Sequence, residues 1–153
     1  MPVFDWNGYN DFARWVLEPE SVPVPSEEVR YRNAISRGYY AMLHLVREFY
    51  KEKIRRYPLK VKGGNSHNQL INELEEGLVG YYQGNEEIAV RAKKICATLR
   101  TSLDLRNMAD YEVEPNDPMD DSTARMIFEF FDDVQEEIDA IRNKYKEEES
   151  TKS

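Results

Sequence analysis

Apolar residues recur at intervals of three and four along most of this chain, whereas the strict alternation typical of strands is nearly absent. In an α-helix this spacing places the apolar residues in a stripe along one face, and that face is buried in the fold. With 153 residues and short connections between helical segments, the pattern predicts an all-α fold, an antiparallel four- to five-helix up-and-down bundle. The most regular stripe consists of Ala124, Ile127, Phe128, Phe131, Val134, Ile138, Ile141 and Tyr145.

Proline, glycine and capping residues divide the chain into segments. A first helix is predicted over 6–17, followed by a proline-punctuated linker. Residues 1–25 are expected to pack on the bundle, residues 26–147 to form it, and residues 148–153 to be a disordered tail. The helices of the bundle are expected to begin near Ser26, Ser66, Asn85 and Asp121.

Opposite charges are concentrated in different parts of the chain. The formal net charge is −8, yet the segment from Arg30 to Lys62 has ten Lys/Arg and two Asp/Glu. The segment from Asp110 to Asp139 has twelve Asp/Glu and a single Arg. Two explanations remain open: a basic surface that binds phosphate, or two solvated helix faces of opposite sign that attract each other.

Several classes of protein are disfavoured by what the sequence lacks. It has one cysteine, Cys96, no apolar run of the roughly 20 residues that a spanning helix needs, and no signal-peptide pattern at Met1. We therefore expect a cytoplasmic protein with no membrane partner, and an inert core thiol at Cys96. Neither a Glu-x-x-His pair nor a glycine-rich phosphate loop occurs, so no metal and no cofactor are expected.

The predicted second helix has an unusual polar face. Its apolar stripe (Ile35, Tyr39, Met42, Val46, Phe49) and a strip of small residues (Ala34, Gly38, Ala41) occupy most of the surface that a core helix buries. A solvent-exposed face would be rich in Glu and Lys, but this helix has side chains with specific hydrogen-bond geometry instead. These polar residues are Asn33, Arg37, Tyr40, His44 and Arg47, with Ser36 beside them.

The apolar stripe of the fourth helix continues into charged residues. The stripe is Ile88, Ala92, Ile95, Leu99 and Leu103, and further steps of three and four reach Arg106 and Asp110. Buried charges are costly unless they are paired and hydrogen-bonded. Either Arg106 and Asp110 form an internal salt bridge, with or without Arg37, or the helix end opens into a cleft suited to phosphate.

Two segments of the sequence resemble a known family. Residues 32–44 (Arg-Asn-Ala-Ile-Ser-Arg-Gly-Tyr-Tyr-Ala-Met-Leu-His) resemble the second-helix signature of HEPN domains, especially the branch with Ser-Arg-x-Tyr-Tyr-Ala. Residues 105–111 (Leu-Arg-Asn-Met-Ala-Asp-Tyr) resemble its Arg-x-x-Ala-Asp-Tyr motif, and the Ser66–His67 pair also fits. The similarity in element order extends over about residues 26–145, but only these two segments are specific.

The resemblance implies an all-helical bundle that is commonly a homodimer. Many HEPN proteins are metal-independent ribonucleases, often toxins of bacterial and archaeal defence, and are frequently encoded beside a nucleotidyltransferase that serves as antitoxin. Their catalytic pattern is an Arg followed, after four to six residues, by a His; here Arg106 and Asn107 are present, but Tyr111 stands where the His is expected. The resemblance thus assigns catalysis to Arg106, Asn107 and Tyr111. Supporting or RNA-binding roles are assigned to Arg37, Asp110, Ser36, Tyr40, His44, Arg47 and Arg32.

The missing histidine leaves the function open. Tyrosine, with a pKa near 10, is a poor general base at pH 7. His44 is either a substitute base or a polar residue on an exposed face, and His67 has no predicted partner. Tyr40 and Tyr111 either stack on bases or bond to the Arg–Asp pair. Three hypotheses follow: a divergent ribonuclease or toxin, a non-catalytic module that binds RNA or a nucleotide, and a domain that binds a nucleotidyltransferase.

Overall fold

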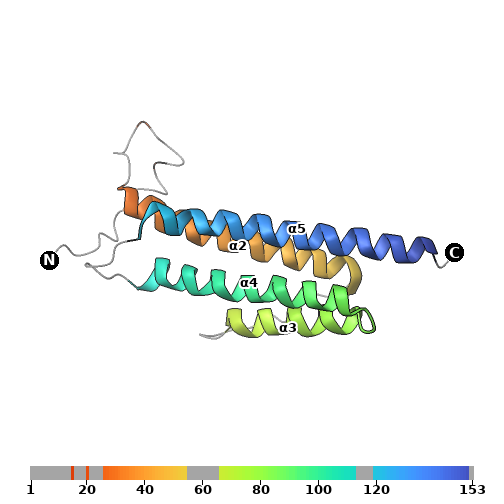
Figure 1. Cartoon of the computed structure of the whole chain (residues 1–153). Coiled ribbons are helices and arrows are strands. Elements are labelled where there is room, and N and C mark those ends of the chain that lie inside the picture. The colour runs from red at the N-terminus through yellow and green to blue at the C-terminus, as the bar shows by residue number, and fades with distance from the viewer. Residues whose placement is uncertain (1–14, 16–19, 21–25, 55–65, 113–118, 152–153) are drawn as a thin grey trace.

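The computed structural model describes residues 15, 20, 26–54, 66–112 and 119–151. This part of the chain contains helices and no strand, so the all-α prediction is confirmed for it (Figure 1). Apart from Trp15, which is helical, the helix predicted over 6–17 lies outside the described residues. The described helices are α2 (Glu27–Ile54), α3 (Ser66–Tyr81), α4 (Glu86–Tyr111) and α5 (Asp121–Thr151).

The predicted capping residues begin the helices. The Ser26 hydroxyl accepts a hydrogen bond from the Val29 amide at 3.4 Å, and the Asn85 side chain accepts one from Ile88 at 3.1 Å. These bonds satisfy amides that have no partner inside the helix. Gly84, with φ of +93°, makes the turn between α3 and α4, a left-handed conformation that glycine adopts without strain.

The last helix is longer than predicted. It begins as expected at Asp121, after the Asp120 carboxylate accepts a hydrogen bond from the Thr123 amide at 2.8 Å. It then continues to Thr151, whereas the sequence predicted disorder from residue 148. Lysine and glutamate, which are frequent in the last turns, are good helix formers.

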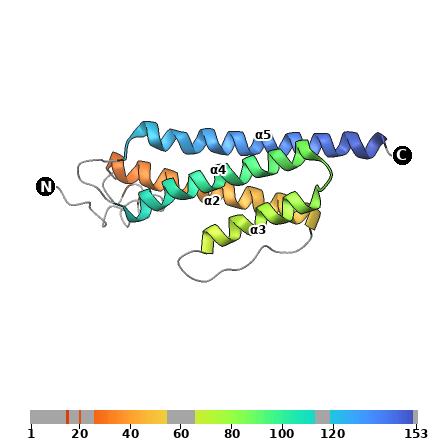
Figure 2. The same cartoon turned by 60° about the horizontal axis from the view of Figure 1, so that its bottom comes forward.

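The helices do not follow a strict up-and-down order. In both views α2, α3 and α5 run in one direction and α4 runs against them (Figures 1 and 2). Tyr39 of α2 contacts His67 of α3, and Tyr50, further along α2, lies against Gly77, further along α3. The two helices therefore run parallel. The antiparallel prediction is therefore wrong for this pair. The eleven residues 55–65 can span up to about 36 Å, which exceeds the roughly 24 Å length of α3.

The core lies where the apolar stripes predicted it. Every member of the α2 stripe is buried, as is every member of the α4 stripe, and α4 packs against all three other helices. Cys96 is buried among them, and burial raises the pKa of its thiol to about 12, so it stays protonated at neutral pH. In the α5 stripe Phe131 and Tyr145 are partly buried, and Phe128, which lines a hollow beside α2, is half exposed.

Gly77 lets α3 approach α2 closely. A Cβ atom at this position would lie 2.5 Å from Cε2 of Tyr50, a fully buried ring. We expect Gly77→Ala to destabilise the protein by up to about 2 kcal/mol, because overpacking costs about 1–3 kcal/mol and the gain in helix propensity is about 1 kcal/mol. Gly80→Ala in the same helix, with nothing within 4 Å, is expected to stabilise it. Urea unfolding of both variants measures the difference; equal shifts would contradict close packing at Gly77.

Candidate functional site

A cluster of polar side chains lies where the C-terminal end of α4 meets α2. It is centred on Arg106, whose side chain is only 11 % exposed, as the inward position on the stripe predicted. We call this group the Arg106 cluster. Its members are Arg106, Asn107, Asp110 and Tyr111 of α4 and Ser36 and Tyr40 of α2.

A carboxylate anchors the guanidinium. Nε of Arg106 lies 2.8 Å from Oδ2 of Asp110, one turn further along α4, so the two residues form the ion pair that was one of the two alternatives left open by the sequence. The Ser36 hydroxyl donates to the same oxygen at 3.2 Å, so α2 helps to hold the pair. The Asp110 side chain is 19 % exposed. A paired, largely buried arginine keeps its orientation before any ligand arrives, which is what electrostatic preorganisation requires.

Two exposed tyrosines flank the guanidinium. The hydroxyls of Tyr40 and Tyr111 accept hydrogen bonds from Nη2 of Arg106 at 2.9 and 3.3 Å. Its Cζ lies 5.3 and 5.2 Å from the centroids of the same two rings, within the range of cation–π contact. Tyr111 is nevertheless 68 % exposed and Tyr40 is 36 % exposed. The tyrosines therefore bond to the Arg–Asp pair and also present aromatic surface to solvent, so the two roles considered for them are compatible.

The donor count of Arg106 leaves room for a ligand. A guanidinium has five N–H groups. Nε faces Asp110, both N–H groups of Nη2 have a tyrosine oxygen within reach, and Nη1 donates to Oδ1 of Asn107 at 3.2 Å. Within the described part of the chain three of the five N–H groups are hydrogen-bonded, whereas the buried Nε lies at ion-pair distance from Asp110 without forming a hydrogen bond. One N–H of Nη1 remains for an incoming acceptor.

His67, which the sequence left without a partner, belongs to the same neighbourhood. Its Nδ1 lies 2.9 Å from the Tyr39 hydroxyl, and its ring packs edge-on against Tyr39 and Tyr40, with centroids 5.5 and 5.8 Å away. Burial, and then the positive charge of Arg106, hold the pKa of His67 below its ordinary value. Only the parallel course of α2 and α3 brings it here, so no periodicity within one helix signals the contact.

Arg32 supports the site without facing a ligand. Its side chain is 1 % exposed, and Nη1 donates to the backbone oxygens of Met108, Ala109 and Glu112 at 2.9–3.0 Å. Its Nε and Nη2 bond to the Glu28 carboxylate. Arg32 thus satisfies the free carbonyls at the end of α4. Because the guanidinium is enclosed, it is not placed for direct contact with RNA.

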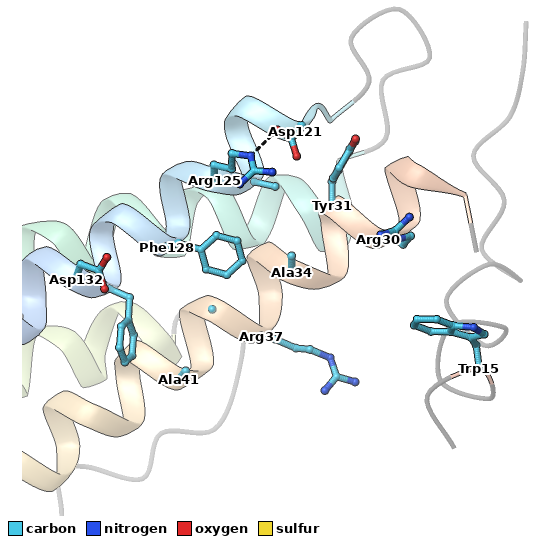
Figure 3. A pocket seen from close by; sticks show the side chains of 13 residues that line it. Trp15, Arg30, Tyr31, Ala34, Arg37, Ala41, Asp121, Arg125, Phe128 and Asp132 are labelled. Carbon is cyan, nitrogen blue, oxygen red and sulfur yellow. Dashed lines mark hydrogen bonds and ion pairs between the residues drawn. The ribbon is translucent and has the colours of Figure 1, made fainter. Parts of the chain in front are cut away.

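The other predicted polar residues of α2 lie elsewhere. Arg37 lines an open hollow of about 720 Å³ that shares no residue with the Arg106 cluster. Figure 3 shows the Arg37 side chain extending from α2 on the side away from Phe128 and Asp132 of α5. A supporting position for Arg37 beside Asp110 is therefore not what the structure shows. His44 is exposed and Arg47 is partly exposed.

Comparisons with protein-family models, with curated proteins and with solved structures found no match to this chain. Among the described helices, none combines the length and the apolar character needed to cross a membrane. The functional assignment therefore depends on the geometry of the Arg106 cluster and on the two segments that resemble HEPN motifs.

Proposed function

We propose that this chain is an HEPN-type protein that acts on single-stranded RNA at the Arg106 cluster, as a metal-independent ribonuclease. The observation that supports this most is the guanidinium of Arg106, held by Asp110 and flanked by two exposed tyrosines. The groups of both resembling segments, Ser36 and Tyr40 from one and Arg106 to Tyr111 from the other, meet in this one cluster.

The proposed phosphate contact uses the remaining N–H of Arg106. Negative charge develops on the non-bridging oxygens when the 2′-hydroxyl of a ribose attacks the adjacent phosphate. A fixed guanidinium stabilises that charge better in a partly enclosed site than in water. Asn107, bonded to the same Nη1, would help to orient it.

The tyrosines explain a preference for unpaired strands. A base in a duplex hides its faces in the stack, whereas a single strand can place a base against an aromatic ring. Tyr111 and Tyr40 both have exposed ring surface, and Met108 beside them is 39 % exposed. Phosphate and base contacts can then be made at adjacent positions of one strand.

The decisive experiment is the incubation of the purified protein with a pool of single-stranded RNA in EDTA. We expect cleavage with 2′,3′-cyclic phosphate ends, because the proposed nucleophile belongs to the RNA. DNA of the same sequence, which lacks the 2′-hydroxyl, is the matched substrate control and should remain intact. Absence of RNA cleavage under these conditions would contradict the ribonuclease.

Stacking on Tyr111 can be tested by binding alone. We expect Tyr111→Ala to weaken the binding of single-stranded RNA by about 5- to 100-fold, since base–aromatic stacking contributes about 1–3 kcal/mol. Tyr111→Phe keeps the ring and should bind nearly as tightly as the wild type. Tyr81→Ala removes an exposed tyrosine from α3 and serves as control. Fluorescence anisotropy at fixed salt measures all three, and equal losses in Tyr111→Ala and Tyr81→Ala would exclude stacking on Tyr111.

A second candidate function is a non-catalytic HEPN module that binds RNA, a nucleotide or a nucleotidyltransferase partner. The low exposure of Arg106 favours it, because a largely buried Arg–Asp pair within α4, bonded to Ser36 of α2, can also serve a purely structural role. RNA binding without cleavage in EDTA would select this alternative. In either case a homodimer is proposed, since a second copy would bring two clusters to one groove.

A further inference from the structure

We propose that His67, and not Tyr111, accepts the proton of the 2′-hydroxyl in this chain, with Tyr39 holding its ring in place. The inference depends on the proposed ribonuclease function and adds the group that performs the proton transfer. The HEPN pattern places a histidine five residues after the arginine, where this chain has Tyr111. In the proposal, His67 of α3 takes the role of that histidine.

The position of His67 supports this role. Tyr40 connects the two groups: its hydroxyl accepts from Nη2 of Arg106 at 2.9 Å, and its ring packs on the imidazole at 5.8 Å between centroids. His67 is partly exposed, so the imidazole is open to a ligand on one side. A strand whose phosphate meets Arg106 would therefore pass beside His67.

Tyr39 occupies Nδ1 of the imidazole, so Nε2 is the nitrogen left for a ligand. Its fully buried ring fixes the imidazole through the 2.9 Å contact between the hydroxyl and Nδ1. In the tautomer that the proposal requires, Nδ1–H donates to the phenolic oxygen and Nε2 has no hydrogen. This is the arrangement of a general base oriented by a third group.

The charge state of His67 suits a base. The groups that face it are Tyr39 and Tyr40 of α2 and Arg106 of α4. Burial lowers the pKa of His67 from 6.5, and the Arg106 charge lowers it further. Burial raises the pKa of Tyr39, so that neighbour stays neutral. The imidazole is therefore unprotonated and able to accept a proton at pH 7.

The proposed step is balanced without any co-reactant. Nε2 of His67 takes the proton of the 2′-hydroxyl while the 2′-oxygen forms a bond to phosphorus. The bond between phosphorus and the 5′-oxygen of the next nucleotide breaks, and this oxygen leaves with a proton from water. The products are a 2′,3′-cyclic phosphate and a free 5′-hydroxyl, and the imidazolium then returns its proton to solvent.

The test compares His67→Gln with the wild type in both RNA binding and cleavage. We expect cleavage to fall by about 10²- to 10⁴-fold, the usual contribution of a general base, while RNA affinity changes less than about threefold. His67→Ala should regain part of its activity in added imidazole, which a merely structural role would not produce. Asn68→Ala, at an exposed position next to His67 on α3, is the control and should cleave normally.

The pH profile is a second readout. The cleavage rate of the wild type should rise with pH as His67 loses its proton and then stay constant at higher pH. The midpoint of the rise should lie below about pH 6.5, the ordinary pKa of histidine, because the pKa of His67 is lowered. His67→Gln should lack this rise, and Tyr39→Phe should reduce the rate without removing it.

Three results would overturn the proposal, and they are distinguishable. If the wild type cleaves and His67→Gln cleaves equally, His67 is not the base but the ribonuclease function stands. If His44→Gln alone abolishes cleavage, the other histidine has the role. If the wild type binds RNA and does not cleave it, both the proposed ribonuclease and the role of His67 fail.

Discussion

Replacing Arg106 by alanine is expected to reduce RNA cleavage by about 10²- to 10³-fold, the loss typical when one preorganised donor to a developing oxyanion is removed. The reason is geometric. The guanidinium is anchored by Asp110 and flanked by Tyr40 and Tyr111, so no other described cation is held in this place. Single-turnover cleavage at saturating protein separates this loss from a loss of affinity.

The variant Arg106→Lys tests geometry against charge. An ammonium keeps the positive charge, but it lacks the planar fork that can face Asp110, both tyrosines and a ligand at once. We expect it to restore less than a tenth of the wild-type rate. Lys93→Ala is the matched control, because it removes one exposed positive charge from α4 about 20 Å along the helix from Arg106. Loss of cleavage in Lys93→Ala equal to that in Arg106→Ala would show a dependence on net charge alone.

The starts of the helices could be predicted because they are determined locally. Ser26 and Asn85 cap α2 and α4 as expected, since capping involves residues only three positions apart. The direction of α3 could not be predicted from the preference for short antiparallel connections. It depends on how Gly77 fits against Tyr50, a contact between two helices whose relative register no local pattern reveals.

The site was predictable to the extent that it lies on one helix. Arg106 and Asp110 are separated by one turn, so the period of the α4 stripe placed both of them inward. Ser36 and Tyr40 were predicted as neighbours on one face of α2, but their contacts with α4 needed the packing of the two helices. His67 was missed because its partners come from other helices.

The enclosed position of Arg32 was not predicted although a signal was present. It lies three residues before Ile35, so it continues the buried stripe of α2 in the same way that Arg106 continues the stripe of α4. The motif resemblance placed it with the polar residues instead. An arginine at a position of the buried stripe therefore predicts an enclosed guanidinium. Whether that guanidinium faces a ligand or backbone carbonyls depends on the neighbouring helices, which the sequence does not reveal.

Loss of Arg32 is expected to be the most destabilising single change at this end of the bundle. Arg32→Ala removes the guanidinium from three carbonyls at the end of α4 and from Glu28. Breaking a buried pair by removing one partner costs about 3–5 kcal/mol, and we expect about 3 kcal/mol here because Glu28 is partly exposed. Chemical denaturation measures the change, provided that unfolding remains two-state.

Arg30→Ala is the matched control, since Arg30 lies two residues away on α2 and is exposed. Its effect should stay within about 0.5 kcal/mol, as for most surface substitutions. Arg32→Lys should recover only part of the loss, because an ammonium has three donors and cannot reach Glu28 and the carbonyls together. If Arg32→Ala were no more destabilising than Arg30→Ala, the end of α4 would not need its arginine cap. The anchoring of the Arg106 cluster would then depend on Asp110 and Ser36 alone.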